Sequence, residues 1–158
     1  MLTVAEADSF LSTPKSAVSG MEWRPGLLKR TDVQWWDWDC AIEINGMVPE
    51  GTRVILQWRP AVGAASAKYN CGLLYRNDRV YALDFDPESL HTNKVGVGRA
   101  QYRKQFGPGT HEHTWSAEGY GYAEPLQNFA DFAGLFDYLA RPWNLWVDFD
   151  GFDPLRGS

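Results

Sequence analysis

Cysteine is scarce in this chain, because Cys40 and Cys71 are the only two among 158 residues. A domain of this length buries roughly two thirds of the surface of its extended chain, so its fold does not depend on disulfide bonds. Two cysteines also give no sign of the disulfide framework found in small secreted domains. We therefore expect two free thiols that pack as small hydrophobic side chains.

The sequence also has no long apolar run and no excess of positive charge. No stretch approaches the run of about 18 apolar residues that crosses a bilayer. Residues 1–6 lack the basic start and apolar stretch of a secretory signal. We therefore expect a cytoplasmic protein with no membrane partner. The formal net charge of −5 argues against a protein that coats nucleic acid by bulk electrostatics, but it allows a local basic pocket.

Helical signals stand near both ends of the chain. Residues 3–6, Thr-Val-Ala-Glu, have the spacing of a capping box, which predicts a short helix over residues 4–11. Residues 12–30 are rich in Ser, Gly and Pro without a clear period, which predicts a loop. A second helix is predicted after Pro125, where apolar side chains recur at helical spacing and Arg141-Pro142 ends the pattern. These side chains are Phe129, Phe132, Ala133, Phe136 and Leu139.

Alternating apolar and polar side chains predict strands between the two helices. The predicted strands cover residues 36–44, 53–59, 69–75, 80–85 and 110–115, and a last short extended segment covers residues 145–149. Turn signals at Asn45-Gly46 and Asn77-Asp78 join the first four strands into an antiparallel meander. No repeat or long linker divides the chain. We therefore predict one α+β domain over residues 1–158, with a meander of about five to six strands packed against the C-terminal helix and a short N-terminal helix.

The three histidines of the chain, His91, His111 and His113, are its most informative chemical feature, since they all fall within residues 91–113. If the triplet His111-Glu112-His113 is extended, both imidazoles lie on one face of a strand. An imidazole titrates near neutral pH, so such a pair can act as general base and general acid or can bind a metal. We take the three histidines as candidate catalytic residues.

Metal binding is one interpretation of the triplet. His111 and His113, followed by Glu118, match part of the first cupin signature, in which these side chains hold a catalytic metal. Gln105 stands where that signature has a glycine, and no histidine follows His113 to supply the second cupin motif. His91 would then be a third ligand, beside Glu118 or water. The sequence therefore requires no cofactor, and a divalent metal is the alternative.

Acid–base chemistry without a metal is the other interpretation. Two imidazoles placed across a phosphodiester can remove a proton from a 2′-hydroxyl and give one to the leaving oxygen. Asn93, two residues after His91, is the candidate that orients a phosphate or an imidazole. Asp84 and Asp86 either fix a histidine tautomer or only close a strand. The candidate contacts for an anionic substrate are Arg79, Arg99 and Arg103.

The order of these parts resembles a known family. A hairpin that carries residues 79–85 is followed by His91-Thr92-Asn93, then by residues 109–113, and then by a Phe-rich helix. This order is similar to that of the small TumE-like toxins of prokaryotic toxin–antitoxin modules, over about residues 69–139. The chain departs from that family by its long aromatic N-terminal section, its fewer histidines and its acidic balance. The resemblance implies a toxin-like role, with RNA as a substrate, a cognate antitoxin as a partner, and the three histidines at the matching positions.

A function without catalysis is the alternative. An acidic domain with eight Trp residues is also typical of a binding or inhibitory protein from a phage or mobile element. Residues 148–153 place carboxylates beside aromatic rings, and an exposed segment of this kind would fit a basic partner surface. Convergence of the three histidines in a pocket favours the enzyme, whereas dispersed histidines favour the binding module.

Overall fold

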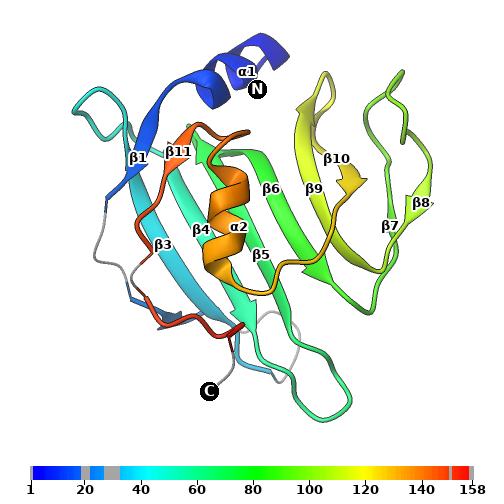
Figure 1. Ribbon diagram of the computed structural model, residues 1–158. Coiled ribbons are helices and arrows are strands. Elements are labelled where there is room, and N and C mark those ends of the chain that lie inside the picture. The colour runs from blue at the N-terminus through cyan, green and yellow to red at the C-terminus, as the bar shows by residue number, and fades with distance from the viewer. Residues whose placement is uncertain (1, 19–21, 27–32, 150, 157–158) are drawn as a thin grey trace.

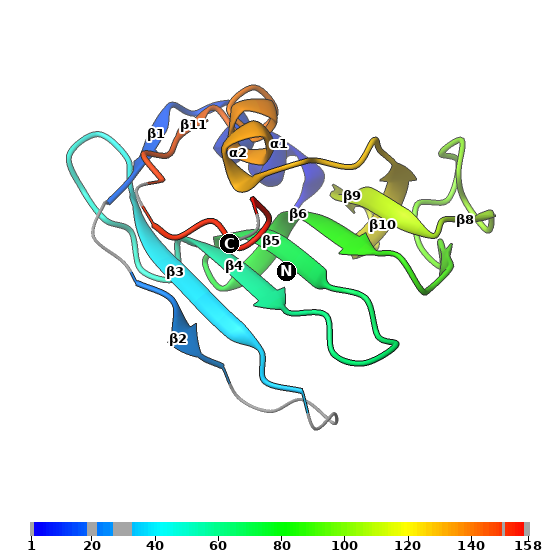
Figure 2. The same cartoon turned by 60° about the horizontal axis from the view of Figure 1, so that its bottom comes forward.

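One curved β-sheet forms most of the protein (Figure 1). The computed structural model describes residues 2–18, 22–26, 33–149 and 151–156. Its two helices, α1 (Val4–Ser12) and α2 (Phe132–Leu139), lie on the same side of the sheet (Figure 2). The predicted α+β class is therefore confirmed. None of the described helices has the length and apolar content needed to cross a membrane.

Six consecutive strands of the sheet form the predicted antiparallel meander. They are β3 (Trp36–Glu43), β4 (Arg53–Arg59), β5 (Lys68–Tyr75), β6 (Asp78–Asp86), β9 (Gly109–Ser116) and β10 (Gly119–Pro125). They lie side by side in chain order, each antiparallel to the next. The first five match predicted strands. Strand β10 was not predicted, because residues 119–125 hold two glycines and a proline and show no regular alternation.

The sheet is larger than predicted, and it is mixed rather than purely antiparallel. Strand β1 (Lys15–Ala17) pairs antiparallel with β3 and parallel with β11 (Leu145–Trp146), and β2 (Arg24–Pro25) also pairs with β3. The prediction of a loop over residues 12–30 was therefore wrong at both short strands. Strands of two or three residues are too short to carry a period, and they form because the edge of β3 offers unpaired backbone groups. Residues 19–21 and 27–30 of that loop lie outside the described residues.

The two faces of the sheet differ in chemistry. Residues paired directly across antiparallel strands share a face, so the register sorts the side chains into rows. One row, on the helix side, is buried and consists of Trp38, Leu56, Cys71 and Leu83. The neighbouring row on the opposite face, here called the polar row, consists of Asp37, Gln57, Asn70, Asp84 and His111. The sheet therefore carries an apolar core on one side and a line of polar groups on the other.

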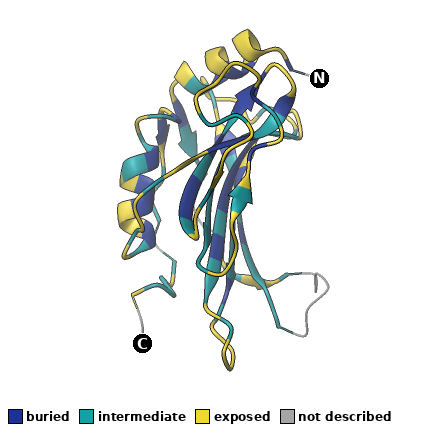
Figure 3. Cartoon of the chain, turned by 90° about the vertical axis from the view of Figure 1, so that its right-hand side faces the viewer, coloured by how far each residue is buried: buried dark blue, intermediate teal, exposed yellow. Residues whose placement is uncertain are grey.

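Helix α2 covers the apolar face because its own apolar side chains recur on one side of the helix. Its four buried residues are Phe132, Leu135, Phe136 and Leu139, and the colouring by burial separates this inner side from an exposed outer side (Figure 3). Asp131 caps its N-terminus by accepting a hydrogen bond from the Gly134 backbone N–H at 2.7 Å. The capping box predicted at Thr3 and Glu6 is present at the start of α1. Both cysteines are free and buried, as predicted.

Candidate functional site

The three histidines converge on the open face of the sheet and are here called the histidine cluster. Strand β9 carries His111 and His113 on one face, and His91 comes from β7 (His91–Thr92). The ring centroids are 5.0 Å apart for His91–His111, 5.0 Å for His91–His113 and 4.9 Å for His111–His113. One ring nitrogen of each histidine lies within 4.8 Å of one from each of the other two. The sequence prediction that these residues share a site therefore agrees with the geometry.

A short hairpin brings His91 to the cluster. Strand β7 pairs antiparallel with β8 (Gln105–Phe106), so that His91 stands opposite Phe106. The Phe106 ring packs against both His91, at 5.3 Å between centroids, and His111, at 5.9 Å. This contact joins the hairpin to β9, and it gives the cluster one apolar wall. Neither strand was predicted, because each has only two residues.

Asn93 holds the hairpin against the edge of the sheet. Its side-chain oxygen accepts the Ala123 N–H of β10 at 2.7 Å, and its Nδ2 donates to the Ala123 carbonyl at 2.8 Å. Nδ2 also donates to the Gln101 carbonyl at 2.9 Å, which fixes the orientation of the amide. The side-chain oxygen of Asn93 also lies 3.2 Å from Nε2 of His91. Asn93 is 1% exposed, so it orients an imidazole, one of its predicted roles, and has little surface for a phosphate.

Asp84 is the carboxylate of the cluster. It stands opposite His111 on β6, and its Oδ2 lies 3.1 Å from Nε2 of His113 and 4.0 Å from Nε2 of His111. Asp84 therefore has the geometry predicted for a residue that fixes a histidine tautomer. Asp84 Oδ1 and His113 Nδ1 are buried and have no hydrogen-bond partner among the described residues. Such atoms are costly to leave unpaired, so each can accept a hydrogen bond or bind a ligand.

Burial sets the protonation of the other two histidines. Burial lowers the pKa of His91, and the neighbouring His113 and His111 lower this pKa further. Burial likewise lowers the pKa of His111, followed by the effect of His113. Both pKa values then lie below the ordinary 6.5 of imidazole, so both rings are neutral at pH 7 and each offers one lone pair.

A pocket of about 450 Å³ opens beside the cluster. His91, His111 and Asp84 line it, together with Asn70 of the polar row and Trp35. Two cations also line it, Arg59 and Lys68, and acidic partners neutralise both. Lys68 lies 2.8 Å from Asp86 and 3.2 Å from Glu88, and Arg59 lies 4.0 Å from Glu88. The pocket therefore presents polar groups and neutral imidazoles, and its own cations are already paired.

The three arginines proposed as anion contacts lie elsewhere. Arg99 stacks on Tyr122 at 3.7 Å and donates to Thr114 Oγ1 at 2.9 Å. Arg103 stacks on Tyr102 at 5.2 Å, and Arg79 lies over Tyr120 at 5.6 Å. The described lining of the pocket contains none of the three arginines. Nearby aromatic rings offer each guanidinium a face to stack on, and the role of the three arginines as anion contacts stays a prediction.

Glu118 has a role other than the one predicted, and Asp86 has the second of its two predicted roles. Glu118, the fourth ligand of the partial cupin match, accepts hydrogen bonds from the Gly96 N–H at 3.2 Å and the Val97 N–H at 3.1 Å. Asp86 binds Lys68, and it accepts the Glu88 N–H at 3.0 Å and the Ser89 N–H at 3.1 Å. Glu118 therefore holds a loop, and Asp86 closes the turn after β6 instead of fixing a histidine tautomer.

The acidic and aromatic residues 148–153 are partly packed into the fold. Phe149 lies 5.5 Å from the Trp38 ring and 5.4 Å from the Phe136 ring. Asp153 accepts the Phe132 N–H at 2.8 Å, at the start of α2. Asp150, a further member of this segment, lies outside the described residues. Phe149 and Asp153 therefore support the helix, whereas Asp148 and Phe152 are exposed.

Sequence reasoning missed two side chains that complete the site. Asn70 belongs to the polar row and lines the pocket, and Tyr120 packs against His113 at 5.1 Å between ring centroids. Burial, followed by the charge of Asp84, raises the pKa of Tyr120 to about 12. Asn70 alternates with apolar residues in β5, so its face could be read from the sequence, but its neighbours depend on strand register.

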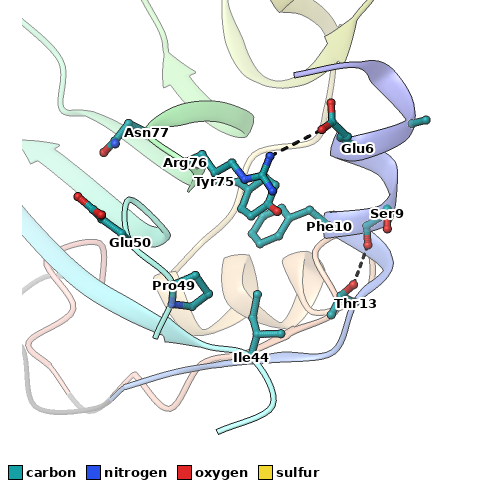
Figure 4. Close-up of a pocket in the computed structure, with 11 residues that line it drawn as sticks. Glu6, Ser9, Phe10, Thr13, Ile44, Pro49, Glu50, Tyr75, Arg76 and Asn77 are labelled. Carbon is teal, nitrogen blue, oxygen red and sulfur yellow. Dashed lines mark hydrogen bonds and ion pairs between the residues drawn. The ribbon is translucent and has the colours of Figure 1, made fainter. Parts of the chain in front are cut away.

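Another hollow among the described residues lies away from the histidines. It measures about 910 Å³ and lies between α1, residues 44–50 and the turn after β5 (Figure 4). Arg76 and Glu6 form an ion pair across it at 3.7 Å, and Phe10 stacks on Tyr75 at 4.3 Å. Its described lining holds no histidine, cysteine or lysine, so we take the histidine cluster as the candidate site.

The families suggested by the sequence, the TumE-like toxins and the cupins, remain predictions. Nothing in the fold bears on the toxin resemblance, and Glu118 departs from the cupin ligand set. The argument for function therefore rests on the geometry of the cluster. Comparison of the chain with protein-family models, with curated proteins and with solved structures gave no match.

Proposed function

We propose that the histidine cluster is the active site of an enzyme that cleaves phosphodiesters, with RNA as the substrate and a toxin-like role for the protein. The observation that carries the proposal is the convergence of three imidazoles and one carboxylate beside a pocket. Histidines are the side chains best suited to move protons at neutral pH. A structural role alone does not require all three histidines of a chain to meet at one point.

The proposed chemistry divides the proton transfers among the histidines. Neutral His91 and His111 line the pocket, and either can accept the proton of a 2′-hydroxyl as general base. The other of these two imidazoles, once protonated, can give a proton to the leaving oxygen as general acid. His113 is hydrogen-bonded to Asp84 and packs against both rings, so it is a positioning residue. Asn93 is a positioning residue in this scheme, because it holds His91 without lining the pocket.

A basic segment that begins three residues after His91 supports RNA as the substrate. The residues between β7 and β8 include four exposed cations, Lys94, Arg99, Arg103 and Lys104. Two backbone hydrogen bonds join the ends of this segment. The Asn93 N–H donates to the Lys104 carbonyl at 3.2 Å, and the Arg103 N–H donates to the Asn93 carbonyl at 3.1 Å, so both ends lie beside Asn93, two residues after His91 in the chain. A local group of cations attracts a phosphate backbone even when the net charge of the protein is negative. The half-buried ring of Tyr102 lies in the same segment, beside Arg103.

The test is cleavage of single-stranded and structured RNA by the purified protein. We expect the wild type to cleave RNA, and the variants His91→Gln and His111→Gln to lose at least about 100-fold in rate, as expected for loss of general acid–base catalysis. Asp137→Asn, an exposed carboxylate change on α2, is the matched control and should cleave like the wild type. Circular dichroism and thermal melting of each variant separate loss of chemistry from loss of fold.

The same assay can reject the proposal. Absence of cleavage by a folded wild type on every RNA would do so, and so would cleavage that persists in both histidine variants. In that event the acidic binding or inhibitory module becomes the leading function, and the search turns to partner proteins such as a cognate antitoxin.

A further inference from the structure

The spacing of the three imidazoles equals that of ligands around one metal ion. A metal at about 2.0–2.1 Å from a ring nitrogen lies roughly 3.2 Å from the centroid of that ring, so tetrahedral angles place ligand centroids roughly 5.2 Å apart. The three observed separations are 5.0, 5.0 and 4.9 Å. Other packed rings of the site have similar separations, 5.1 Å for His113–Tyr120 and 5.3 Å for His91–Phe106, so the argument for a metal also needs the ring nitrogens. The backbone of β7 and β9 thus already sets the distances of a three-histidine metal centre.

Each imidazole is also held at one nitrogen by a hydrogen-bond acceptor. Nε2 of His91 faces Asn93 Oδ1 at 3.2 Å, and Nδ1 of His111 faces the Gly109 carbonyl at 3.3 Å. Nε2 of His113 faces Asp84 Oδ2 at 3.1 Å. A histidine that binds a metal almost always donates its other N–H to a carbonyl or carboxylate in this way. The lone pairs left free are Nδ1 of His91, Nε2 of His111 and Nδ1 of His113.

Two of these three lone pairs belong to buried side chains. His111 and His113 are 8% and 4% exposed, and Nδ1 of His113 has no partner among the described residues. A buried acceptor without a partner costs free energy, and a metal ion would remove that cost. Asp84 places a carboxylate beside the three imidazoles, which favours a divalent cation over an anion.

We propose that His91, His111 and His113 bind one divalent transition-metal ion of the zinc class, through Nδ1, Nε2 and Nδ1 respectively, with Asp84 orienting His113. The inference rests on the proposed function and names the cofactor of the same site. With the metal bound, the three lone pairs are its ligands, so metal-activated water takes the place of the free imidazoles in the proton transfers. Imidazole ligands suit zinc, copper, nickel and iron, whereas magnesium and calcium prefer oxygen.

The fourth coordination position of this centre faces the pocket. His91, His111 and Asp84 line the pocket of about 450 Å³, so a substrate or water reaches the centre from that side. Three protein ligands with one open position are typical of catalytic zinc sites, whereas structural zinc sites are closed by four protein ligands. A metal held there would polarise a phosphoryl oxygen or activate a water molecule for hydrolysis.

The test is titration of the chelator-treated full chain with Zn²⁺ by isothermal calorimetry, followed by Co²⁺ and visible absorption. We expect one saturable site per chain and the visible bands of four-coordinate cobalt. His91→Gln and His111→Gln should weaken binding at least about 100-fold, because each removes a ligand. Asp84→Asn removes an orienting carboxylate and should weaken binding by about 10–100-fold. Asp137→Asn, an exposed carboxylate on α2, is the control and should bind like the wild type.

A measurement on the wild type keeps the test independent of variant folding. Nitrogen NMR of the histidine side chains distinguishes Nδ1 from Nε2, and Zn²⁺ should change the signals of the three lone-pair nitrogens named above. Absence of saturable binding up to about 100 μM Zn²⁺ would overturn the inference. Binding that leaves all three imidazoles unchanged, or that survives in both folded histidine variants, would also overturn it.

The two proposals can fail separately. RNA cleavage decides the proposed function, and Zn²⁺ binding decides the metal centre. Cleavage by a protein that binds no metal would retain the enzyme and reject the centre. Zn²⁺ binding at the histidines without cleavage of any RNA would retain the centre and reject the nuclease.

Discussion

At the residue scale, Asn93 takes the place of a strand partner for β10. Its amide pairs with both the N–H and the carbonyl of Ala123, as a neighbouring backbone would. The same side chain contacts His91 and the Gln101 carbonyl. One buried amide therefore links the sheet edge, the segment between β7 and β8, and the histidine cluster.

Replacement of Asn93 should destabilise the fold as well as displace His91. Asn93→Ala leaves the backbone groups of Ala123 and Gln101 without their partner, and buried polar groups left unpaired cost about 1–3 kcal/mol each. We expect the free energy of unfolding in urea to fall by about 2–4 kcal/mol in total. The exposed Gln105→Ala on β8 is the control. A loss below about 0.5 kcal/mol would show that water replaces the amide readily.

Asp86 provides a pH-dependent test beside the pocket. Burial raises the pKa of Asp86, but hydrogen bonds from Lys68, Glu88 and Ser89 outweigh burial and hold this pKa below its ordinary value of 3.8. The Asp86 carboxyl therefore binds a proton more tightly in the unfolded state than in the folded state. Its contribution to the free energy of unfolding is fully present above the ordinary pKa of Asp and is lost as the pH falls through the pKa of Asp86 in the folded state.

We expect Asp86→Asn to lower the free energy of unfolding by about 1 kcal/mol at pH 7, and the difference from the wild type to disappear in acid. Urea unfolding at a series of pH values measures this difference. Asp8→Asn, an exposed change on α1, should show neither effect. A difference that grows as the pH falls would contradict the assignment.

At the element scale, the segment between β7 and β8 is held against β10 by close packing. Gly96 has φ +88° and lies against the ring of Tyr122, so that a Cβ at this position would overlap Tyr122 Cδ2. Tyr122 is fully buried, and its hydroxyl accepts the Gln101 N–H at 3.0 Å. The position of the segment, and of His91 at its start, therefore depends on this glycine.

Two glycines of this segment give a matched pair of variants. Gly98 has φ +86°, but a Cβ added there meets open space. We expect Gly98→Ala to cost about 1 kcal/mol through backbone strain alone. Gly96→Ala adds overlap with a buried ring, so we expect a loss about 1–3 kcal/mol larger. Thermal or urea unfolding measures both, and equal losses would show that the Tyr122 ring moves aside freely.

At the scale of the whole molecule, Lys15 connects distant parts of the chain. It is 6% exposed, and its ammonium donates to the Leu11 carbonyl at 3.0 Å, to the Thr13 carbonyl at 2.7 Å and to the Trp143 carbonyl. Leu11 lies in the last turn of α1, Thr13 is the C-cap of α1, and Trp143 lies in the turn after α2. One cation therefore satisfies backbone acceptors at the C-terminal ends of both helices, where positive charge is favourable.

Lys15→Met tests this connection, because it keeps the length of the side chain and removes its donors. We expect the free energy of unfolding to fall by about 2–4 kcal/mol, since three buried carbonyls lose a charged donor. The exposed Lys94→Met should change stability by less than about 0.5 kcal/mol. A neutral result for Lys15→Met, measured by urea unfolding at pH 7, would mean that water reaches these carbonyls.

Local signals in the sequence were sufficient for the longer elements. The capping box at Thr3 predicts α1, and the apolar spacing from Phe132 to Leu139 predicts α2. The alternation along β3, β4, β5, β6 and β9 predicts five strands of the meander. In the strands and in α2, apolar side chains recur at the period of the element, because one face of the element is buried.

The sequence by itself determined that His111 and His113 share a face, because alternation within one strand is a local property. Only the tertiary structure decided that His91 and Asp84 join them, since this depends on the register of β6 with β9 and on the two-residue pairing of β7 with β8. It also decided that Arg99 and Arg103 stack on tyrosines away from the pocket, and that β1 pairs with β11 from the far end of the chain. Contacts between distant segments leave no period in the sequence, because strand register and edge pairing are fixed by the packing of the whole sheet.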